Sequence, residues 1–270
     1  MFDFAALVAN ENMKIFRRVR SWIMLGLLVL LTAAISIIAS VTASSTIKMW
    51  DMTSMELMIL IPLANIFCVI IAADIVASEF TNGTIKLLLI RPWTRSKVLL
   101  SKYVSLLIFV LITLAVVYVS TLLINSLVFG YEGGVMAQQV FGVLDPGMSA
   151  WSYMNQYFLL QLVSFIVTVT LAFMISAVFR SSALAIGLSL FIVLMSEVLS
   201  QLFSLVNKPW VDYVLFQHLN LTKYLRMDAA LGGSNQDMMT LGFSLAVLAG
   251  YYIVFMALSW FVFTKRDVAA

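Results

Sequence analysis

The chain has almost none of the residues that bind transition metals or carry out redox chemistry. It contains one histidine, His218, and one cysteine, Cys68, among 270 residues. Transition-metal sites draw several ligands from these residue types, so we expect no such site. A single cysteine also excludes an intramolecular disulfide. We interpret Cys68 as an apolar packing residue and His218 as a residue at a membrane–water boundary.

Charged residues are scarce as well. Asp, Glu, Lys and Arg make up 11% of the sequence, whereas an average soluble domain contains about 25%. Hydrophobic residues make up 63%. This balance excludes an ordinary soluble domain and indicates a membrane protein. A chain of 270 residues leaves no room for a large soluble domain beside it, so we expect residues 1–270 to form a single transmembrane domain.

Motifs of the common catalytic sites are also missing from the sequence. The chain has no GxxxxGKS or GxxxxGKT phosphate-binding loop, no HExxH, no CxxC and no GxSxG. Such motifs hold phosphates, metals or nucleophiles in place. We therefore predict that the chain is not an enzyme and that it binds no metal or cofactor of its own.

The feature that dominates the sequence is a set of six long apolar stretches. They cover residues 22–44, 55–77, 103–127, 157–179, 183–206 and 239–263. Each has about twenty residues or more, enough to cross a hydrocarbon core about 30 Å thick as a helix. The stretches are continuous rather than alternating, which favours helices over the strands of a membrane barrel. We predict an all-α membrane protein with six transmembrane helices.

Basic residues are distributed unevenly between the two sides that this layout creates. Twelve of the 16 Lys and Arg residues fall on the side that carries the N-terminus, and residues 125–152 on the other side contain none. Because cytoplasmic loops are enriched in Lys and Arg, we predict a multi-pass protein with both termini in the cytoplasm. The sequence pI of about 9.0 then reflects this asymmetry and contact with membrane lipid, not binding of nucleic acid.

The segment before the first apolar stretch, residues 1–20, has a helical pattern but is not a span. Phe4 and Ile15 lie on an apolar side, and Lys14 and Arg18 fall largely on the other. A basic amphipathic helix of this kind lies in the plane of the membrane interface. Two interpretations stay open: a helix that only sets the orientation of the first span, and a helix that docks on a partner.

The loop between the second and third stretches, residues 78–97, combines turn signals with an apolar piece. An Asn-Gly dipeptide predicts a chain reversal, Pro92 ends the piece that follows, and Thr94 is suited to cap the third helix. Residues 87–90 read Leu-Leu-Leu-Ile. A short apolar helix that faces water must be covered, so we predict an interaction surface here.

The stretch between the last two spans, residues 207–237, is too apolar for a loop in free solvent. It contains Trp210, Tyr213 and Tyr224, and Trp and Tyr favour the membrane–water boundary. We expect short re-entrant helices that dip into the outer leaflet and close the top of the bundle.

Two residues inside the spans are candidates for a pathway or a gate. Glu197 lies deep in the fifth span, where a charge is costly unless it faces the protein interior, water or a partner. Two interpretations of Glu197 stay open: a group that lines a substrate pathway, and a neutral acid bonded to Gln161 or Ser164 of the fourth span. Pro62 frees the backbone carbonyl of Met58 and predicts a kink in the second span.

Another acid, Asp74, lies near the cytoplasmic end of the second span. A carboxylate at this depth is stabilised by a cation of the adjoining loop. We therefore expect Asp74 to pair with a base such as Arg95, in a structural rather than a functional role.

Taken together, the layout resembles that of the permease subunits of type-2 ABC exporters. The shared features are six spans, a basic amphipathic N-terminal helix, and a loop that contains Glu79, Gly83, Thr84, Pro92 and Arg95. The resemblance covers the entire chain, and that loop is its most specific piece. The chain is similar to the small bacterial permeases that accompany bacitracin-resistance and lantibiotic-resistance transporters, which implies the bacterial cytoplasmic membrane and a role in antibiotic resistance.

The resemblance implies that residues 78–97 are a coupling loop that docks on a separate ATPase subunit. The residues assigned to this contact are Glu79, Gly83, Thr84, Lys86, Leu87, Leu88, Arg91, Pro92, Arg95 and Lys97. The resemblance also implies two copies of a cytoplasmic ABC ATPase, which holds ATP and Mg, and a second permease, identical or related. The substrate moved out of the cell would be a hydrophobic or amphipathic peptide antibiotic, lipid-like molecule or drug.

An alternative function belongs to another class of protein. In it, the chain is a membrane sensor that signals envelope stress to a partner through the same loop and transports nothing. ATP hydrolysis that is stimulated by a substrate separates the two functions. A self-contained secondary transporter is disfavoured because the internal repeats typical of such folds are not apparent in the sequence.

Overall fold

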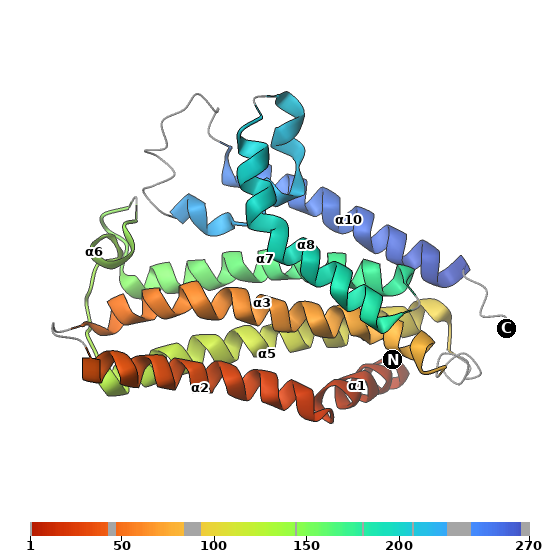
Figure 1. Ribbon diagram of the computed structural model, residues 1–270, viewed down its shortest axis with the longest axis horizontal. Coiled ribbons are helices and arrows are strands. Elements are labelled where there is room, and N and C mark those ends of the chain that lie inside the picture. Colours follow the sequence, from red (N-terminus) through yellow and green to blue (C-terminus); the bar gives the residue numbers. More distant parts are fainter. Residues whose placement is uncertain are drawn as a thin grey trace.

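The computed structural model describes residues 2–42, 47–83, 93–143, 145–179, 181–206, 208–225 and 239–265. These residues are almost entirely helical (Figure 1). Within the described ranges there is no β-sheet, and one isolated antiparallel bridge joins Met136 to Ser149. The prediction of an all-α protein is confirmed for this part of the chain.

Six helices are long and apolar enough to cross a membrane, as predicted. They are α2 (Val19–Thr42), α3 (Met49–Thr81), α5 (Arg95–Phe129), α7 (Ala150–Val178), α8 (Ser182–Ser204) and α10 (Leu241–Lys265). Helices α3 and α5 extend beyond their apolar stretches, to 33 and 35 residues. Helix α5 begins where the sequence predicts, because the Thr94 side chain accepts a hydrogen bond from the backbone N–H of Lys97.

Helix α3 is the central element of the bundle. It packs against α2, α5, α7 and α8, and Figure 1 shows it between α5 and α7. In the most apolar part of α3, 61% of the residues are buried inside the protein, compared with 11% for α8. Helices α3, α5 and α7 therefore form the inside of the bundle, and α2, α8 and α10 form its periphery.

The first helix, α1 (Phe2–Phe16), is separate from the first span, which begins at Val19. It packs against α5 and α2. Figure 1 shows α1 at the same end of the bundle as the last turn of α3, the first turn of α5 and the last turn of α10. We call this end the α1 end. A helix within residues 1–20 was expected; its position relative to a membrane stays a prediction.

At the α1 end, the contact between α3 and α7 is tightly closed. Ala72, Ala73 and Val76 of α3 and Phe173 of α7 are fully buried. Small residues on α3 let the two helices approach closely. The Ser176 hydroxyl of α7 accepts hydrogen bonds from the backbone N–H groups of Val76 and Ala77, at 3.1 and 2.9 Å. No wide passage runs between the two helices here.

The opposite end of the bundle carries short helices. These are α6 (Ala137–Phe141), η1 (Pro209–Tyr213), η2 (Leu215–Gln217) and η3 (Leu221–Leu225). The last three confirm that residues 208–225 form short helical pieces, here of the 3₁₀ type. Residues 226–238 of the predicted re-entrant stretch lie outside the described residues. Whether the short helices enter the outer leaflet stays a prediction.

His218 is not a boundary residue, contrary to the expectation from sequence. Its side chain is fully buried. Nε2–H donates to the Asp212 carbonyl at 2.8 Å, and Nδ1 accepts from the Ser244 hydroxyl at 2.7 Å. The Tyr224 hydroxyl in turn donates to Ser244 Oγ at 2.6 Å. Burial lowers the pKa of His218 and outweighs the hydrogen bond to Asp212, so the neutral ring ties the short helices to α10.

Candidate functional site

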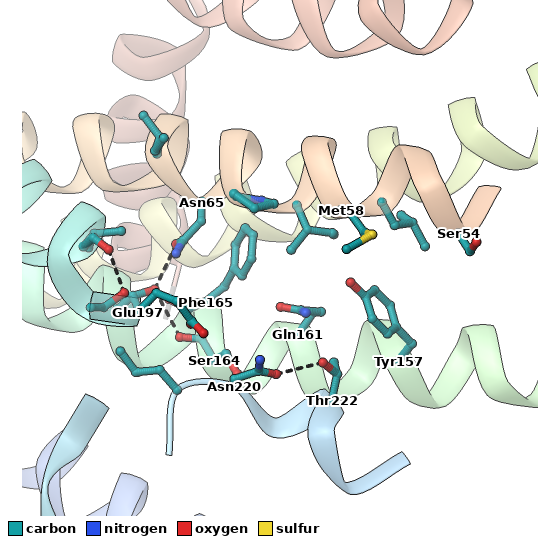
Figure 2. A pocket seen from close by; sticks show the side chains of 18 of the residues that line it. Ser54, Met58, Asn65, Tyr157, Gln161, Ser164, Phe165, Glu197, Asn220 and Thr222 are labelled. Atoms are coloured by element: carbon teal, nitrogen blue, oxygen red, sulfur yellow. Dashed lines mark hydrogen bonds between the residues drawn. The ribbon is translucent and has the colours of Figure 1, made fainter. Parts of the chain in front are cut away.

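A cavity of about 690 Å³ lies between α3, α7, α8 and the segment around η3 (Figure 2). Helix α3 contributes residues from Ser54 to Ile66, α7 from Tyr153 to Thr168, and α8 from Val193 to Glu197. Val140 and Phe141 of α6 also reach its wall. The cavity thus begins where the closed contact at the α1 end stops, and it occupies the other half of the bundle.

The cavity wall is mixed in polarity. Its apolar part includes Leu57, Met58, Ile61, Phe165 and Leu194. The polar and amphipathic side chains are Ser54, Asn65, Tyr153, Tyr157, Gln161, Ser164, Thr168, Ser196, Glu197, Asn220 and Thr222. Apolar pockets with a few polar groups are typical binding sites for small molecules. This wall is suited to a molecule that is itself part apolar and part polar.

Glu197 lines this cavity, on the exposed side of α8. Within the described ranges, its carboxylate makes no hydrogen bond or ion pair. The predicted partners Gln161 and Ser164 line the same cavity (Figure 2), but no hydrogen bond joins them to Glu197. The sequence therefore placed the three residues together correctly. The direct bond between them is not found. Pro62 also lines the cavity, and α3 continues through it as one helix.

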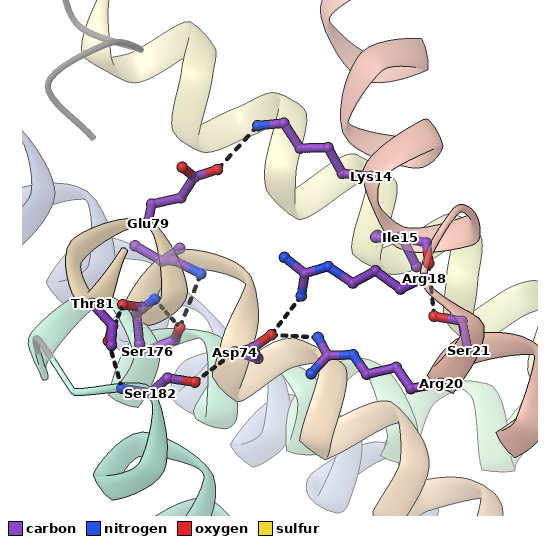
Figure 3. A network of polar contacts seen from close by, with 12 residues as sticks. Lys14, Ile15, Arg18, Arg20, Ser21, Asp74, Glu79, Thr81, Ser176 and Ser182 are labelled. Carbon is purple, nitrogen blue, oxygen red and sulfur yellow. Dashed lines mark hydrogen bonds and ion pairs between the residues drawn. The ribbon is translucent and has the colours of Figure 1, made fainter. Parts of the chain in front are cut away.

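Four charged residues at the α1 end form a compact network, the Lys102 cluster (Glu11, Lys14, Glu79 and Lys102). Lys102 of α5 is fully buried, and its ammonium bonds to Glu11 at 2.8 Å and to Glu79 at 3.0 Å. Lys14 bonds to the same two carboxylates, at 2.7 and 3.0 Å, and Figure 3 shows it reaching across from α1 to Glu79. Three helices, α1, α3 and α5, are thereby joined.

Lys14 keeps its charge in this setting. Its partial burial lowers the pKa, but the hydrogen bonds and charges of Glu11 and Glu79 raise it by more, so the pKa is raised overall. The cluster holds two carboxylates and two ammonium groups, so their formal charges balance. Balanced, hydrogen-bonded charges are the condition under which a buried ionic group is tolerated.

A second network surrounds Asp74 of α3. Its carboxylate accepts hydrogen bonds from Arg18 at 2.7 Å, from Arg20 and from the Ser182 hydroxyl of α8 (Figure 3). The expected pairing of Asp74 with Arg95 is therefore wrong. Arg95 donates instead to the Thr264 carbonyl of α10 at 3.2 Å. The cations come from Arg18, in the connection between α1 and α2, and from Arg20, in the first turn of α2, which spacing along the chain did not reveal.

The segment predicted to couple to an ATPase is only partly described. Thr84, Lys86, Leu87, Leu88, Arg91 and Pro92 lie outside the described residues. Of the others, Glu79 belongs to the Lys102 cluster, Arg95 contacts α10, and Lys97 is exposed on the first turn of α5. Gly83 has a φ of +69°, a left-handed conformation that favours glycine and fits the predicted chain reversal.

Sequence reasoning missed a third polar group, the Glu56 cluster (Ser36, Thr53, Glu56 and Asn125). All four side chains are fully buried between α2, α3 and α5. Glu56 Oε1 lies 2.6 Å from Ser36 Oγ, and Glu56 Oε2 lies 2.8 Å from Asn125 Nδ2. Asn125 also contacts Ser36 at 2.7 Å and Thr53 at 3.1 Å. The available signal was an acid at position 56 inside an apolar stretch.

Comparisons with known proteins give a family and two relatives. The signature of a family described as protein of unknown function (DUF2705) matches residues 30–269. The chain is 38% identical over 211 residues to "Uncharacterized protein YhcI" of Bacillus subtilis (strain 168); the match covers 77% of this chain and 65% of the relative, so it spans less than two thirds of that protein.

The second relative carries a description that bears on location. The chain is 30% identical over 204 residues to "Uncharacterized membrane protein YdbK" of the same organism, and the match covers 74% of this chain and 76% of the relative. The six apolar helices agree with that description. Helices and relative together indicate a multi-pass membrane protein.

Proposed function

The chain belongs to the DUF2705 family, and from this premise we propose that it is the membrane-spanning permease subunit of an ATP-driven ABC exporter. It moves a hydrophobic or amphipathic molecule out of a bacterial cell. ATP and Mg are bound by a separate cytoplasmic ATPase subunit, present in two copies. A second permease, identical or related, completes the pathway.

The observation that supports this proposal most is the position of α3. One end of α3 carries Asp74 and Glu79, which are anchored to α1, α5 and α8 directly before the predicted coupling loop. The other half of the same helix lines the cavity. A helix of 33 residues is about 50 Å long. A displacement imposed at the loop is therefore carried to the cavity wall by one continuous element.

The orientation that we propose places the α1 end in the cytoplasm. The basic residues Lys14, Arg18, Arg20 and Lys102 are concentrated at that end, as the positive-inside rule requires. Arg17 and Trp22 are exposed at this end and suit contact with anionic lipid. In this orientation the coupling loop faces the cytoplasm, where an ATPase can reach it. The absence of a phosphate-binding loop from the sequence fits a partner that supplies the ATP chemistry.

The test is to isolate the tagged chain from its native membrane and to identify the proteins that remain bound. We expect a stoichiometric protein with a Walker-type ATPase signature, and ATP hydrolysis that rises when substrate is added. Leu88→Asp is expected to lose the ATPase without losing membrane insertion, because a charge in the apolar piece opposes docking in an apolar groove. Leu88→Met is the matched control and keeps the ATPase.

Two results would contradict the proposal. The first is recovery of the chain alone, in a detergent that keeps a known ABC complex whole. The second is full ATPase retention by Leu88→Asp. Either result favours the alternative function, a membrane sensor that transports nothing.

A further inference from the structure

The wall of the cavity carries negative charge but no positive charge among its described residues. Of the described residues that line it, Glu197 is the only one with a formal charge, and no described Lys, Arg or His is among them. Glu197 is an exposed residue in the second half of α8, and apolar residues such as Leu194 and Phe165 line the same cavity. A carboxylate in such a place is stabilised by a positive partner. Within the described ranges, the structure gives it no ion pair.

A cation of the neighbouring η3 segment, Lys223, does not fill this role. Its ammonium donates to the Gln217 carbonyl at 2.8 Å and lies over the Tyr224 ring, 5.2 Å from the ring centre. Burial lowers the pKa of Lys223, and the charge of Glu197 opposes that change only in part. Lys223 is thus bound within its own segment and is not part of the cavity wall.

Aromatic side chains of the wall also favour a cation. Phe141, Tyr153, Tyr157 and Phe165 all line the cavity, and Tyr153 stacks on Phe141 with ring centres 4.2 Å apart. The faces of aromatic rings attract cations, with a gain that grows when water is excluded. The hydroxyl and amide groups of Gln161, Asn220 and their neighbours can bond a polar, uncharged part of the same ligand (Figure 2).

The cavity volume and its position limit the ligand further. A volume of about 690 Å³ lies within the range of about 300–1,000 Å³ found for drug-sized ligands. All lining residues of α3 precede Val69, from which point the contact with α7 is closed by buried side chains. Met55, Met58 and Ile59, beside the cavity on α3, are exposed. A ligand therefore reaches the site from the half of the membrane away from the α1 end.

We propose that this cavity binds an amphipathic cation, that Glu197 is its counter-charge, and that the ligand enters from the membrane half opposite the α1 end. The inference rests on the proposed function only in treating the ligand as the transported molecule. In the proposed orientation, the entry side is the outer leaflet, so the substrate is taken up from the membrane itself and not from the cytoplasm.

The charge preference is tested with two probes of nearly equal size and opposite charge, tetraphenylphosphonium and tetraphenylborate. Binding is measured by calorimetry to the full chain in lipid nanodiscs, where no membrane potential exists, with empty nanodiscs as the blank. We expect saturable binding of the cation and no binding of the anion above the blank. Glu197→Gln keeps the side-chain size and is expected to weaken binding of the cation by roughly tenfold or more.

Asp145→Asn is the matched control, because Asp145 is an exposed acid that does not line the cavity. It is expected to bind the cation like the parent chain. Equal binding of both probes, or equal binding by the parent and Glu197→Gln, would overturn the inference. The binding measurement needs no ATPase, so a negative result contradicts only the inference about the ligand. The proposed function fails by a separate result, the absence of an ATPase that co-purifies with the chain.

The entry side is tested by labelling single cysteines in intact cells, in a Cys68→Ala background. Thr222→Cys lies on the cavity wall, and Arg17→Cys is exposed at the α1 end. We expect a membrane-impermeant maleimide to label Thr222→Cys and tetraphenylphosphonium to slow that labelling. Arg17→Cys should react only after the cells are opened. The reverse pattern, or no protection at Thr222→Cys, would overturn the placement of the ligand.

Discussion

Counting hydrogens in the Glu56 cluster favours one protonation state of Glu56. Ser36, Glu56 and Asn125 form a triangle of three short contacts, each of which needs one hydrogen. Ser36 has one hydrogen to give, and the amide oxygen of Asn125 has none. The Asn125 amide group supplies the contact to Glu56. Ser36 Oγ also lies 2.9 Å from the Thr32 carbonyl, so its one hydrogen faces three acceptors, and a proton on the Glu56 carboxyl would supply one of the missing hydrogens.

The same conclusion holds if the Asn125 amide is turned over. Its NH₂ group then donates to Ser36, and Ser36 donates to Glu56. The amide oxygen now faces Glu56, so Glu56 must again be the donor. In both orientations of the amide a neutral Glu56 supplies a hydrogen that a carboxylate cannot, so we predict that Glu56 is a neutral acid that links α3 to α2 and α5 without a counter-charge.

This state predicts how the cluster tolerates substitution. In Glu56→Gln, the amide has both an oxygen and hydrogens, so it can replace each hydrogen bond of the neutral acid, and we expect nearly unchanged thermal stability in detergent. Glu56→Leu has a similar size but removes the hydrogen bonds that Ser36 and Asn125 make to position 56. It should lower the free energy of unfolding by about 1–3 kcal/mol. A Gln variant as unstable as the Leu variant would mean that Glu56 is charged.

At the residue scale, the sequence predicted local features well and distant partners poorly. Thr94 caps α5 and Cys68 is buried, as expected, because both depend on neighbours in the sequence or on general apolarity. The partner of Asp74 was wrong because the cations come from Arg18 and Arg20, more than fifty positions earlier in the chain. Such contacts depend on how helices pack, which no local pattern records.

At the scale of elements, α1 is held to the bundle by charge rather than by an apolar face alone. Its Glu11 is buried and bonds to Lys102 of α5 and Lys14 of its own helix. Ile15 is the buried apolar residue beside them. Removing one partner from a buried ionic group leaves an unpaired charge, which is strongly destabilising. The packing of α1 against the bundle should therefore depend on Lys102.

Lys102→Met tests this dependence, because methionine keeps most of the side-chain length without the charge. We expect a loss of about 3–5 kcal/mol in the free energy of unfolding, together with faster cleavage of α1 by added protease. Lys97→Met, at an exposed position of the same helix, should change stability by less than about 0.5 kcal/mol.

The double variant Lys102→Met/Glu79→Gln separates charge from packing. It removes one carboxylate along with the ammonium, so the cluster keeps Glu11 and Lys14 as a balanced pair. We expect it to recover part of the lost stability, as coupled residues do. If the loss of stability in the double variant equals the sum of the losses measured for Lys102→Met and Glu79→Gln separately, the two residues are not coupled by charge. The proposed ion pairing in the cluster is then wrong.

The lengths of the helices show where hydropathy no longer predicts the helix ends. The six spans were predicted from hydrophobic runs, and all six are present. Helix α3 nevertheless continues to Thr81, through Asp74 and Glu79. Polar residues remain helical there because their partners on α1, α5 and α8 satisfy them. Hydropathy alone marks the part of a helix in lipid and underestimates the part that is stabilised by polar contacts.

At the scale of the whole molecule, α8 is a helix with an uncovered face. Leu184, Phe191, Val198 and Leu205 are all exposed and are spaced seven residues apart. A repeat of seven apolar positions is the pattern by which one helix packs along another. Helix α2 carries a similar exposed repeat at Ile23, Leu30 and Ile37, but α8 is the less buried of the two helices, with 11% of its most apolar part buried compared with 22% for α2. We expect the second permease to pack along α8.

Disulfide cross-linking in native membranes tests this contact. Phe191→Cys, in a Cys68→Ala background, is expected to give a covalent dimer on mild oxidation if the second permease is identical. Leu30→Cys, equally exposed on α2, should remain monomeric and serves as the control. If both variants stay monomeric, or if only Leu30→Cys forms dimers, α8 does not face a second copy. The partner is then a different permease or lies elsewhere.

The Lys102 cluster also sets an order of events during synthesis. Glu11 leaves the ribosome 91 residues before Lys102, and Glu79 leaves it 23 residues before. Glu11 and Glu79 both bond to Lys14 and to Lys102, so burial of these carboxylates is less favourable before Lys102 is made. We therefore expect α1 to dock only after α5 has been made. Arrival of α5 is the step that seats it, so the oldest part of the chain is among the last to reach its final place.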